Sequence, residues 1–150
     1  MSPTGEVLHR RHDETFDLLQ TAVETLDDAQ WRQGNPPYDG PARATLHALQ
    51  AAEFYTHQCH EVFRWQGKGV WEMSPEELPS RQQMLDYLGR VRQLAGEWIA
   101  HLDERDIAPA GGGAGQAVDA IVYAICHLQH HTGEVCAWMK QFGHPQEKWV

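Results

Sequence analysis

The stretch Cys126-His-Leu-Gln-His-His-Thr-Gly-Glu134 combines an apolar helical pattern with two histidines on one helix face. His127 and His131 are four residues apart, so on an α-helix their directions differ by only ~40° and their heights by one turn. Two imidazoles placed in this way can reach the same metal ion. A third histidine, His47, lies early in another helical stretch, and three imidazoles leave one coordination position open, as in catalytic metal sites. The alternative is a histidine-rich helix that binds no metal.

The composition predicts one globular domain that spans residues 1–150. Hydrophobic residues make up 41% of the chain and charged residues 22%. A net charge of −9 would repel a phosphate backbone, so nucleic acid is not an expected partner. No apolar run approaches the ~20 residues of a membrane span, and the three cysteines form no Cys-x-x-Cys pair. We therefore expect a cytoplasmic protein that is not bound to a membrane, and a homodimer is compatible with this composition.

Apolar periodicity predicts four helices and almost no strand. Their approximate bounds are residues 5–30, 42–66, 80–102 and 116–142. Ser80 and Gln83 resemble a capping box at the start of the third helix, and Gly143 marks the end of the fourth. Each helix would be ~37 Å long at 1.5 Å per residue. Helices of matched length pack most simply as a bundle, so the expected fold class is all-α, with a four-helix bundle architecture.

The predicted fourth helix gathers chemically useful side chains on one strip. Four of them lie within about 40° of His127: Tyr123, His131, Glu134 and Trp138. His130 lies about 60° away from His127, close enough to compete as a ligand or to support one. His12 falls on the apolar stripe of the first helix and is a further candidate for the metal shell. A simple packed histidine is the alternative for His12.

The segment Ile125–Val135, continued to Phe142-Gly143, resembles the fourth helix of the DinB/YfiT-like family. That family shows His-x-x-x-His, then x-Gly-Gln, and about ten residues later a glycine that ends the helix. Its third metal histidine lies near the start of the second helix, where Thr45-Leu-His-Ala48 stands here. The resemblance implies an up-down-down-up bundle that holds a divalent metal through His47, His127 and His131. Glu134 replaces the usual glutamine, and its carboxylate could ligate the metal or act as a catalytic base.

Characterised members of that family include thiol-dependent transferases and isomerases. In these proteins the metal binds the thiolate of a low-molecular-weight thiol such as bacillithiol or mycothiol. The resemblance therefore implies a transferase that activates such a thiol against a small-molecule electrophile. One divalent ion is expected, with zinc and nickel first among the metals that suit three imidazoles. The alternatives are a metal-dependent hydrolase, with water in the open position, and a non-catalytic stress or interaction protein with the same fold.

Arg43, Tyr38 and Trp138 are candidates for contacts with the thiol or the substrate. Arg43 shares a helix side with His47 and could bind the carboxylates of the thiol. Tyr38 and Trp138, together with Trp31, are expected at the mouth of the pocket. The reason is that the loop 31–40 would have to cover the part of the fourth helix that projects beyond the second.

Overall fold

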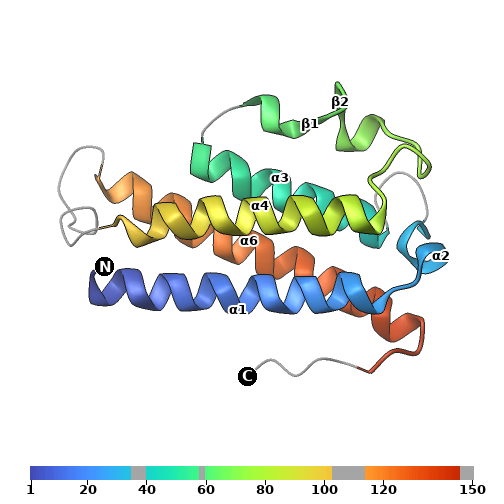
Figure 1. Ribbon diagram of the computed structural model, residues 1–150, viewed down its shortest axis with the longest axis horizontal. Helices are drawn as coiled ribbons and strands as arrows, with labels where there is room; N and C mark the ends of the chain where they lie inside the picture. The colour runs from blue at the N-terminus through green and yellow to red at the C-terminus, as the bar shows by residue number, and fades with distance from the viewer. Residues whose placement is uncertain (35–39, 58–59, 103–113, 146–150) are drawn as a thin grey trace.

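The protein is mostly helical, in a computed structural model that describes residues 1–34, 40–57, 60–102 and 114–145. Figure 1 shows the long helices lying side by side, with a small hairpin beside them. The elements in chain order are α1 (Pro3–Thr25), α2 (Asp28–Trp31), α3 (Pro41–His57), η1 (His60–Phe63), β1 (Arg64–Trp65), β2 (Lys68–Gly69), η2 (Val70–Glu72), α4 (Arg81–Ala100) and α6 (Ala114–Gln141). The expectation of an all-α protein is confirmed at the level of fold class. None of the described helices is long and apolar enough to cross a membrane.

Each long helix packs mainly against two others. α3 contacts α6 and α4, and α1 contacts α4 and α6. In Figure 1, α1 and α6 run in one direction, and α3 and α4 run in the opposite direction. An apolar stripe on each helix faces the space between them, because removing apolar surface from water is favourable. Fully buried members of these stripes include Phe16, Leu19, Leu46, Leu49, Leu88 and Leu128.

The predicted helix 5–30 is interrupted. α1 ends at Thr25, and Leu26 has an extended backbone. Asp27 then opens α2 with a capping box. Its carboxylate accepts a hydrogen bond from the backbone N–H of Gln30 at 2.8 Å, and the side-chain oxygen of Gln30 accepts one from the N–H of Asp27 at 3.1 Å. These local bonds compete with continuation of the helix, so the chain turns here although the apolar pattern continues.

The predicted helix 42–66 also ends early, because α3 stops at His57. Residues 60–72 form two short 3-10 helices on either side of an antiparallel hairpin. The hairpin pairs two residues from each strand: Arg64 with Gly69 and Trp65 with Lys68. Its turn contains Gly67 at a φ of 81°, a conformation that glycine adopts without steric cost. Strands of two residues carry no periodic signal, which is why the sequence predicts none.

Two predicted helix ends agree with the structure. Ser80 caps α4, since its hydroxyl accepts from the N–H of Gln83 at 3.2 Å and the Gln83 side chain accepts from the N–H of Ser80 at 2.8 Å. Gly143 follows α6 at a φ of 83°, the conformation that commonly ends a helix. The glycines at 111–113 lie outside the described residues.

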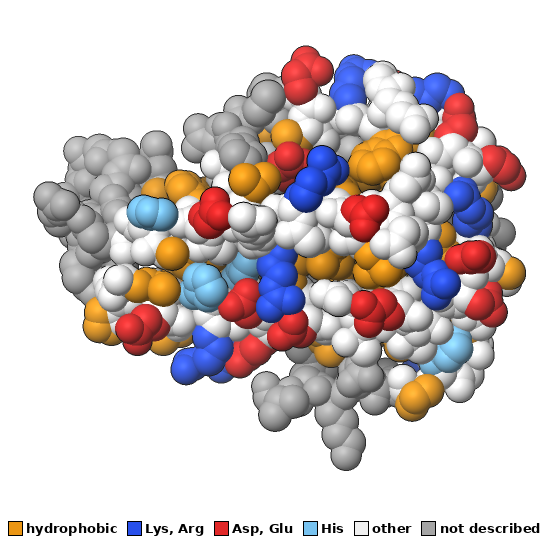
Figure 2. All heavy atoms as spheres, in the orientation of Figure 1, with side chains coloured by type: hydrophobic (Ala, Val, Ile, Leu, Met, Phe, Trp, Pro, Cys, Tyr) orange, Lys and Arg blue, Asp and Glu red, His pale blue; other side chains and the backbone are white. Residues whose placement is uncertain are grey.

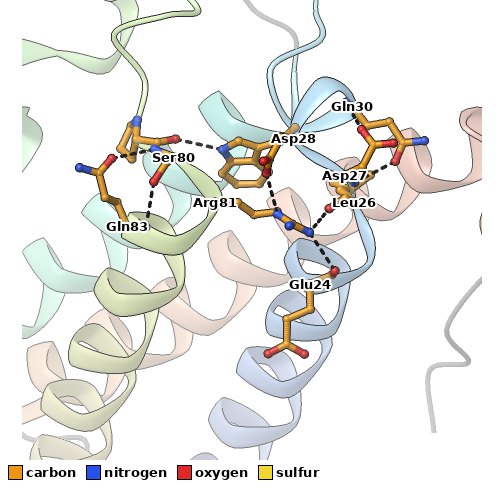
Figure 3. A network of polar contacts seen from close by, with 10 residues as sticks. Glu24, Leu26, Asp27, Asp28, Gln30, Ser80, Arg81 and Gln83 are labelled. Carbon is orange, nitrogen blue, oxygen red and sulfur yellow. Dashed lines mark hydrogen bonds and ion pairs between the residues drawn. The ribbon is translucent and has the colours of Figure 1, made fainter.

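A polar network joins the corner between α1 and α2 to the start of α4 (Figure 3). Arg81 donates to the carbonyl oxygens of Glu24, at 3.2 Å, and of Leu26, and its Nε lies 3.1 Å from the carboxylate of Asp28. Beside it, Trp31 is only 1% exposed, and its indole N–H donates to the carbonyl of Pro79 at 2.9 Å. The prediction of Trp31 at a pocket mouth is therefore wrong, because this ring belongs to the core.

The Trp31–Pro79 bond gives a stability prediction. Trp31→Phe keeps an aromatic ring but leaves the Pro79 carbonyl without its buried donor, so the free energy of unfolding should fall by about 1–3 kcal/mol. Trp71→Phe is the control, because Trp71 is 49% exposed and the change should stay within about 0.5 kcal/mol. Urea denaturation would measure both. Equal stability of the two variants would contradict the structural role of the indole N–H.

His12 is a buried polar side chain of the core. It is 3% exposed and its ring centre lies 4.6 Å from that of Phe16, beside an apolar cavity of about 20 Å³. Nδ1 lies 3.4 Å from a carboxylate oxygen of Asp13, but among the described residues neither ring nitrogen has a hydrogen-bond partner of good geometry. Burial lowers the pKa of His12 to about 4, and the smaller opposing effect of Asp13 does not offset it. His12 is not among the described groups that could share a metal ion, so its placement supports the packed-histidine alternative.

This buried histidine should make the fold sensitive to acid. In the unfolded chain His12 has a pKa near 6.5, whereas in the folded chain it binds a proton only near pH 4. The contribution of His12 to stability is therefore fully present above pH 6.5 and is lost as the pH falls from 6.5 to about 4. The full difference amounts to roughly 3 kcal/mol, since one pKa unit corresponds to about 1.4 kcal/mol.

Urea unfolding at pH 7 and pH 5, with a chelator present, would measure this loss. His12→Leu should reduce the loss between the two pH values, whereas His9→Leu, at a half-exposed position of the same helix, should leave it close to that of the parent. An unchanged loss in His12→Leu would assign the acid sensitivity to other groups.

Candidate metal centre

Three histidines from two packed helices meet in one cluster. His47 lies in the second turn of α3, and His127 and His131 lie near the middle of α6. The ring centres are 5.1 Å apart for His47 and His127, 4.8 Å for His47 and His131, and 4.5 Å for His127 and His131. One ligand atom from each lies within 4.8 Å of the other two, so the group could hold a metal ion. The expectation that the three imidazoles come together is confirmed.

The spacing of the ring nitrogens fits a shared cation. Nε2 of His127 and Nε2 of His131 are 3.3 Å apart. Two imidazole nitrogens bound at ~2.0–2.1 Å to a tetrahedral zinc ion would be about 3.3–3.4 Å apart. Nδ1 of His127 is buried and has no hydrogen-bond partner in the described part of the chain. The cation would therefore be bound through Nε2 of His127, whereas Nδ1 of this ring would carry the proton.

Burial favours the neutral form of two of the three imidazoles, those of His47 and His127. Burial first, and then the proximity of His131 and His47, lower the pKa of His127 to about 4. The pKa of His47 is lowered for the same reasons, with burial first and then the proximity of His131, while Glu134 acts weakly in the opposite direction. A neutral imidazole has a free lone pair, so these rings need not lose a proton before they bind a metal.

Glu134 contacts one of the three imidazole rings, that of His131. One carboxylate oxygen lies 2.6 Å from Nδ1 of His131, and the other lies 3.4 Å from Nε2 of the exposed His130. If Nδ1 carries the proton that bonds to Glu134, Nε2 presents its lone pair to the cluster. The sequence suggested that Glu134 is a metal ligand or a catalytic base, whereas its contact with Nδ1 of His131 favours a third role, in which it orients that ring. His130, His131 and Glu134 also form a second, more exposed group of ligand-type atoms.

The structure gives no support to the predicted contacts with a thiol. Arg43 is 6% exposed, and its guanidinium donates to the backbone carbonyls of Val70 and of Met73, the latter at 2.8 Å. It is therefore engaged in holding the chain around η2 and does not offer a cation to an anionic ligand. Trp138 is half-buried and stacks on Phe142, with ring centres 5.6 Å apart, about two turns beyond His131. Tyr38 lies outside the described residues.

Two aromatic residues at the cluster were missed as contacts. The ring centre of Trp71, in η2, lies 5.4 Å from that of His47. Tyr123 stacks on His127 at 5.9 Å with 23° between the planes, and its other neighbour is Tyr55 at 4.8 Å. Tyr123 could have been found from the sequence, because it shares the strip of His127. Trp71 could not, because it lies in a segment without periodicity.

Two helices bring together three imidazoles, two of them with lowered pKa values, and a carboxylate lies behind the third. No protein-family model and no curated protein matches this chain. The candidate metal centre therefore rests on its own geometry.

Glu134 should tune metal affinity through His131. Glu134→Ala should weaken binding of Zn²⁺ about 10- to 100-fold, the usual effect of removing a partner that orients a ligand. Glu134→Gln keeps an acceptor oxygen but no charge, so its affinity for Zn²⁺ should lie between those of the parent protein and of Glu134→Ala. Asp119→Ala, an exposed carboxylate on the same helix, is the matched control. Competition with a chromophoric chelator measures all four proteins, and parent-like affinity in Glu134→Ala would remove Glu134 from the site.

Proposed function

We propose that this chain is a divalent-metal-dependent enzyme in which His47, His127 and His131 hold the ion. The observation that carries the proposal is the convergence of the three rings, with 3.3 Å between the Nε2 atoms of His127 and His131. A bound divalent cation lowers the pKa of a coordinated thiol or water and so supplies a nucleophile at neutral pH. Glu134 keeps His131 in the orientation and tautomer that this requires.

We further propose that the domain is a DinB-like four-helix bundle with up-down-down-up topology. The run directions of α1, α3, α4 and α6 in Figure 1 support this order, and so does their pairwise packing. The histidines of the cluster also lie where the resemblance implies, one near the start of α3 and two in the long α6.

The first candidate reaction is transfer of a low-molecular-weight thiol, of the bacillithiol or mycothiol type, to a small electrophile. The sulfur loses its proton to solvent and forms a bond with the electrophilic carbon, and the leaving group departs with the electron pair of the broken bond. In this reaction the chain would hold the reacting sulfur at the three-histidine cluster. This candidate rests on the resemblance of residues 125–135 and 45–48 to the DinB/YfiT-like family.

The second candidate is hydrolysis, with water as the nucleophile, and one observation favours it. In the part of the chain that the structure describes, the charged neighbours that influence the pKa values of His47 and His127 are other histidines and Glu134, with no lysine or arginine among them. Arg43 is bound to two carbonyls. A thiol that carries carboxylates would need a cationic contact, whereas water needs none.

Metal content tests the shared basis of both candidates. Protein purified without chelators should contain about one divalent ion per chain, and His131→Ala should lose most of it, because a ligand is removed. His101→Ala, at an exposed position at the end of α4, should keep it. A chelator should lower the melting temperature without unfolding the chain at room temperature, since the core supplies most of the stability. The proposal would be removed if elemental analysis found no divalent metal in the protein, either as purified or after reconstitution with metal.

The reaction is then assigned by assay of the loaded protein. Loss of free thiol in the presence of an electrophile such as a chlorodinitrobenzene would select the transferase. Hydrolysis of activated esters without added thiol would select the hydrolase. A loaded protein that catalyses neither would point to the non-catalytic alternative.

A further inference from the structure

We propose that the ligand of this site carries an aromatic ring without negative charge, and that Trp71 and Tyr123 bind this ring. Trp71, Tyr123 and Tyr55 are called the aromatic rim below. The inference deepens the proposed function, because it names the class of molecule that approaches the metal centre, and its metal-centre context rests on that proposal. The rim itself is defined by contacts that involve no ion.

The rim is in contact with the histidine cluster from two sides. Trp71 is brought by η2 and lies against His47 of α3. Tyr123 lies one turn before His127 on α6 and stacks on that imidazole, with Tyr55 of α3 at its other edge. Aromatic rings that arrive from separate elements thus adjoin two of the three candidate ligands.

Both main rim residues present apolar surface to solvent. Trp71 is 49% exposed and Tyr123 is 52% exposed. In the described part of the chain, the large hydrophobic side chains with comparable exposure are Met1, Val7 and Val122, none of them aromatic. Large aromatic rings are normally well buried, so two exposed ones that both contact the cluster indicate a binding surface rather than chance exposure.

The side chain of Arg43 supports the indole of Trp71. The guanidinium carbon of Arg43 lies 6.0 Å from the centre of the indole, while its N–H groups donate to the carbonyls of Val70, the first residue of η2, and of Met73, which follows η2. Because Arg43 is buried and already bound, it acts as a support for the indole and the segment that carries it. A ring held in this way loses little freedom when a ligand stacks on it.

The charges around the rim disfavour an anion. Glu134 is 47% exposed and lies on the His131 side of the cluster. In the described part of the chain, no lysine or arginine contributes to the lowered pKa values of His47 and His127, and the chain as a whole carries a net charge of −9. Arg43 lies beside Trp71, but it is buried and its guanidinium is bound to two backbone carbonyls. An anionic ring would therefore meet the carboxylate of Glu134 without a free cation to compensate it, whereas a neutral or cationic ring gains stacking on Trp71 and Tyr123.

Binding of three matched probes to the metal-free protein tests the proposal. The probes are 2-naphthylmethanol, which is aromatic and uncharged, 2-naphthoate, which is aromatic and anionic, and decahydro-2-naphthylmethanol, which has similar size but no aromatic ring. Chelator is present throughout, so that a carboxylate cannot bind through an ion. NMR titration, followed at the indole N–H of Trp71, should show 2-naphthylmethanol binding several-fold more tightly than either of the others.

Variants then assign the binding to the rim. Trp71→Ala and Tyr123→Ala should each weaken 2-naphthylmethanol about three- to tenfold, the factor expected from loss of one stacking contact. For these variants the titration is followed at backbone amides of α6. Trp71→Phe should recover part of the loss. Val122→Ala, the exposed neighbour of Tyr123, is the control and should bind like the parent.

Two results would overturn the inference. The first is unchanged affinity in both rim variants, and the second is 2-naphthoate binding as tightly as 2-naphthylmethanol. Metal analysis of the same parent protein separates this inference from the proposed function. If the parent takes up no metal but both rim variants bind 2-naphthylmethanol more weakly than the parent, the aromatic site stands and the metal proposal is removed. If the parent takes up metal but both rim variants bind like the parent, the metal proposal stands and the aromatic site is removed.

Discussion

The packing of α3 against α6 is the constraint on which the candidate site depends. Alanines at buried positions of α3 (Ala44, Ala48, Ala51 and Ala52) have short side chains, and such residues allow two helices to approach closely. Since α3 and α6 run in opposite directions, a residue near the start of α3 can face the middle of α6 (Figure 1). Three imidazoles can therefore meet at ring distances of 4.5–5.1 Å.

A second constraint links the fold to the surface around the site. Arg43 and His47 are one turn apart on α3, so one helix carries both the support for the η2 segment and a candidate ligand. Figure 2 shows mixed basic and acidic side chains with scattered apolar ones on the face it displays. The aromatic rings beside His47 and His127 differ from that pattern in being large, exposed and gathered at the histidine cluster.

The sequence predicted what depends on spacing along helices, and it failed where a cap interrupts an apolar pattern or where a contact joins distant segments. The helical class, the capping box at Ser80 and the meeting of His47 with His127 and His131 all follow from spacing on helices. The break at Leu26 does not, because a capping box at Asp27 overrides an apolar pattern that continues through it. Arg43 was misread as a ligand contact, because its partners are carbonyls about 30 residues away along the chain, and no local pattern reveals such a bond. The contact of Trp71 with His47 was not predicted either, because Trp71 lies in a segment without periodicity.

The separation between core and cluster has an evolutionary consequence. The large apolar side chains that fill the interior, such as Phe16, Leu49 and Leu128, are distinct from the three histidines, which are only half-buried at its margin. A single substitution at His47, His127 or His131 would thus abolish the proposed chemistry and leave the packing that specifies the fold intact. Descendants of such a chain can lose catalysis in one step and survive as folded proteins, with an aromatic surface already available for a new ligand.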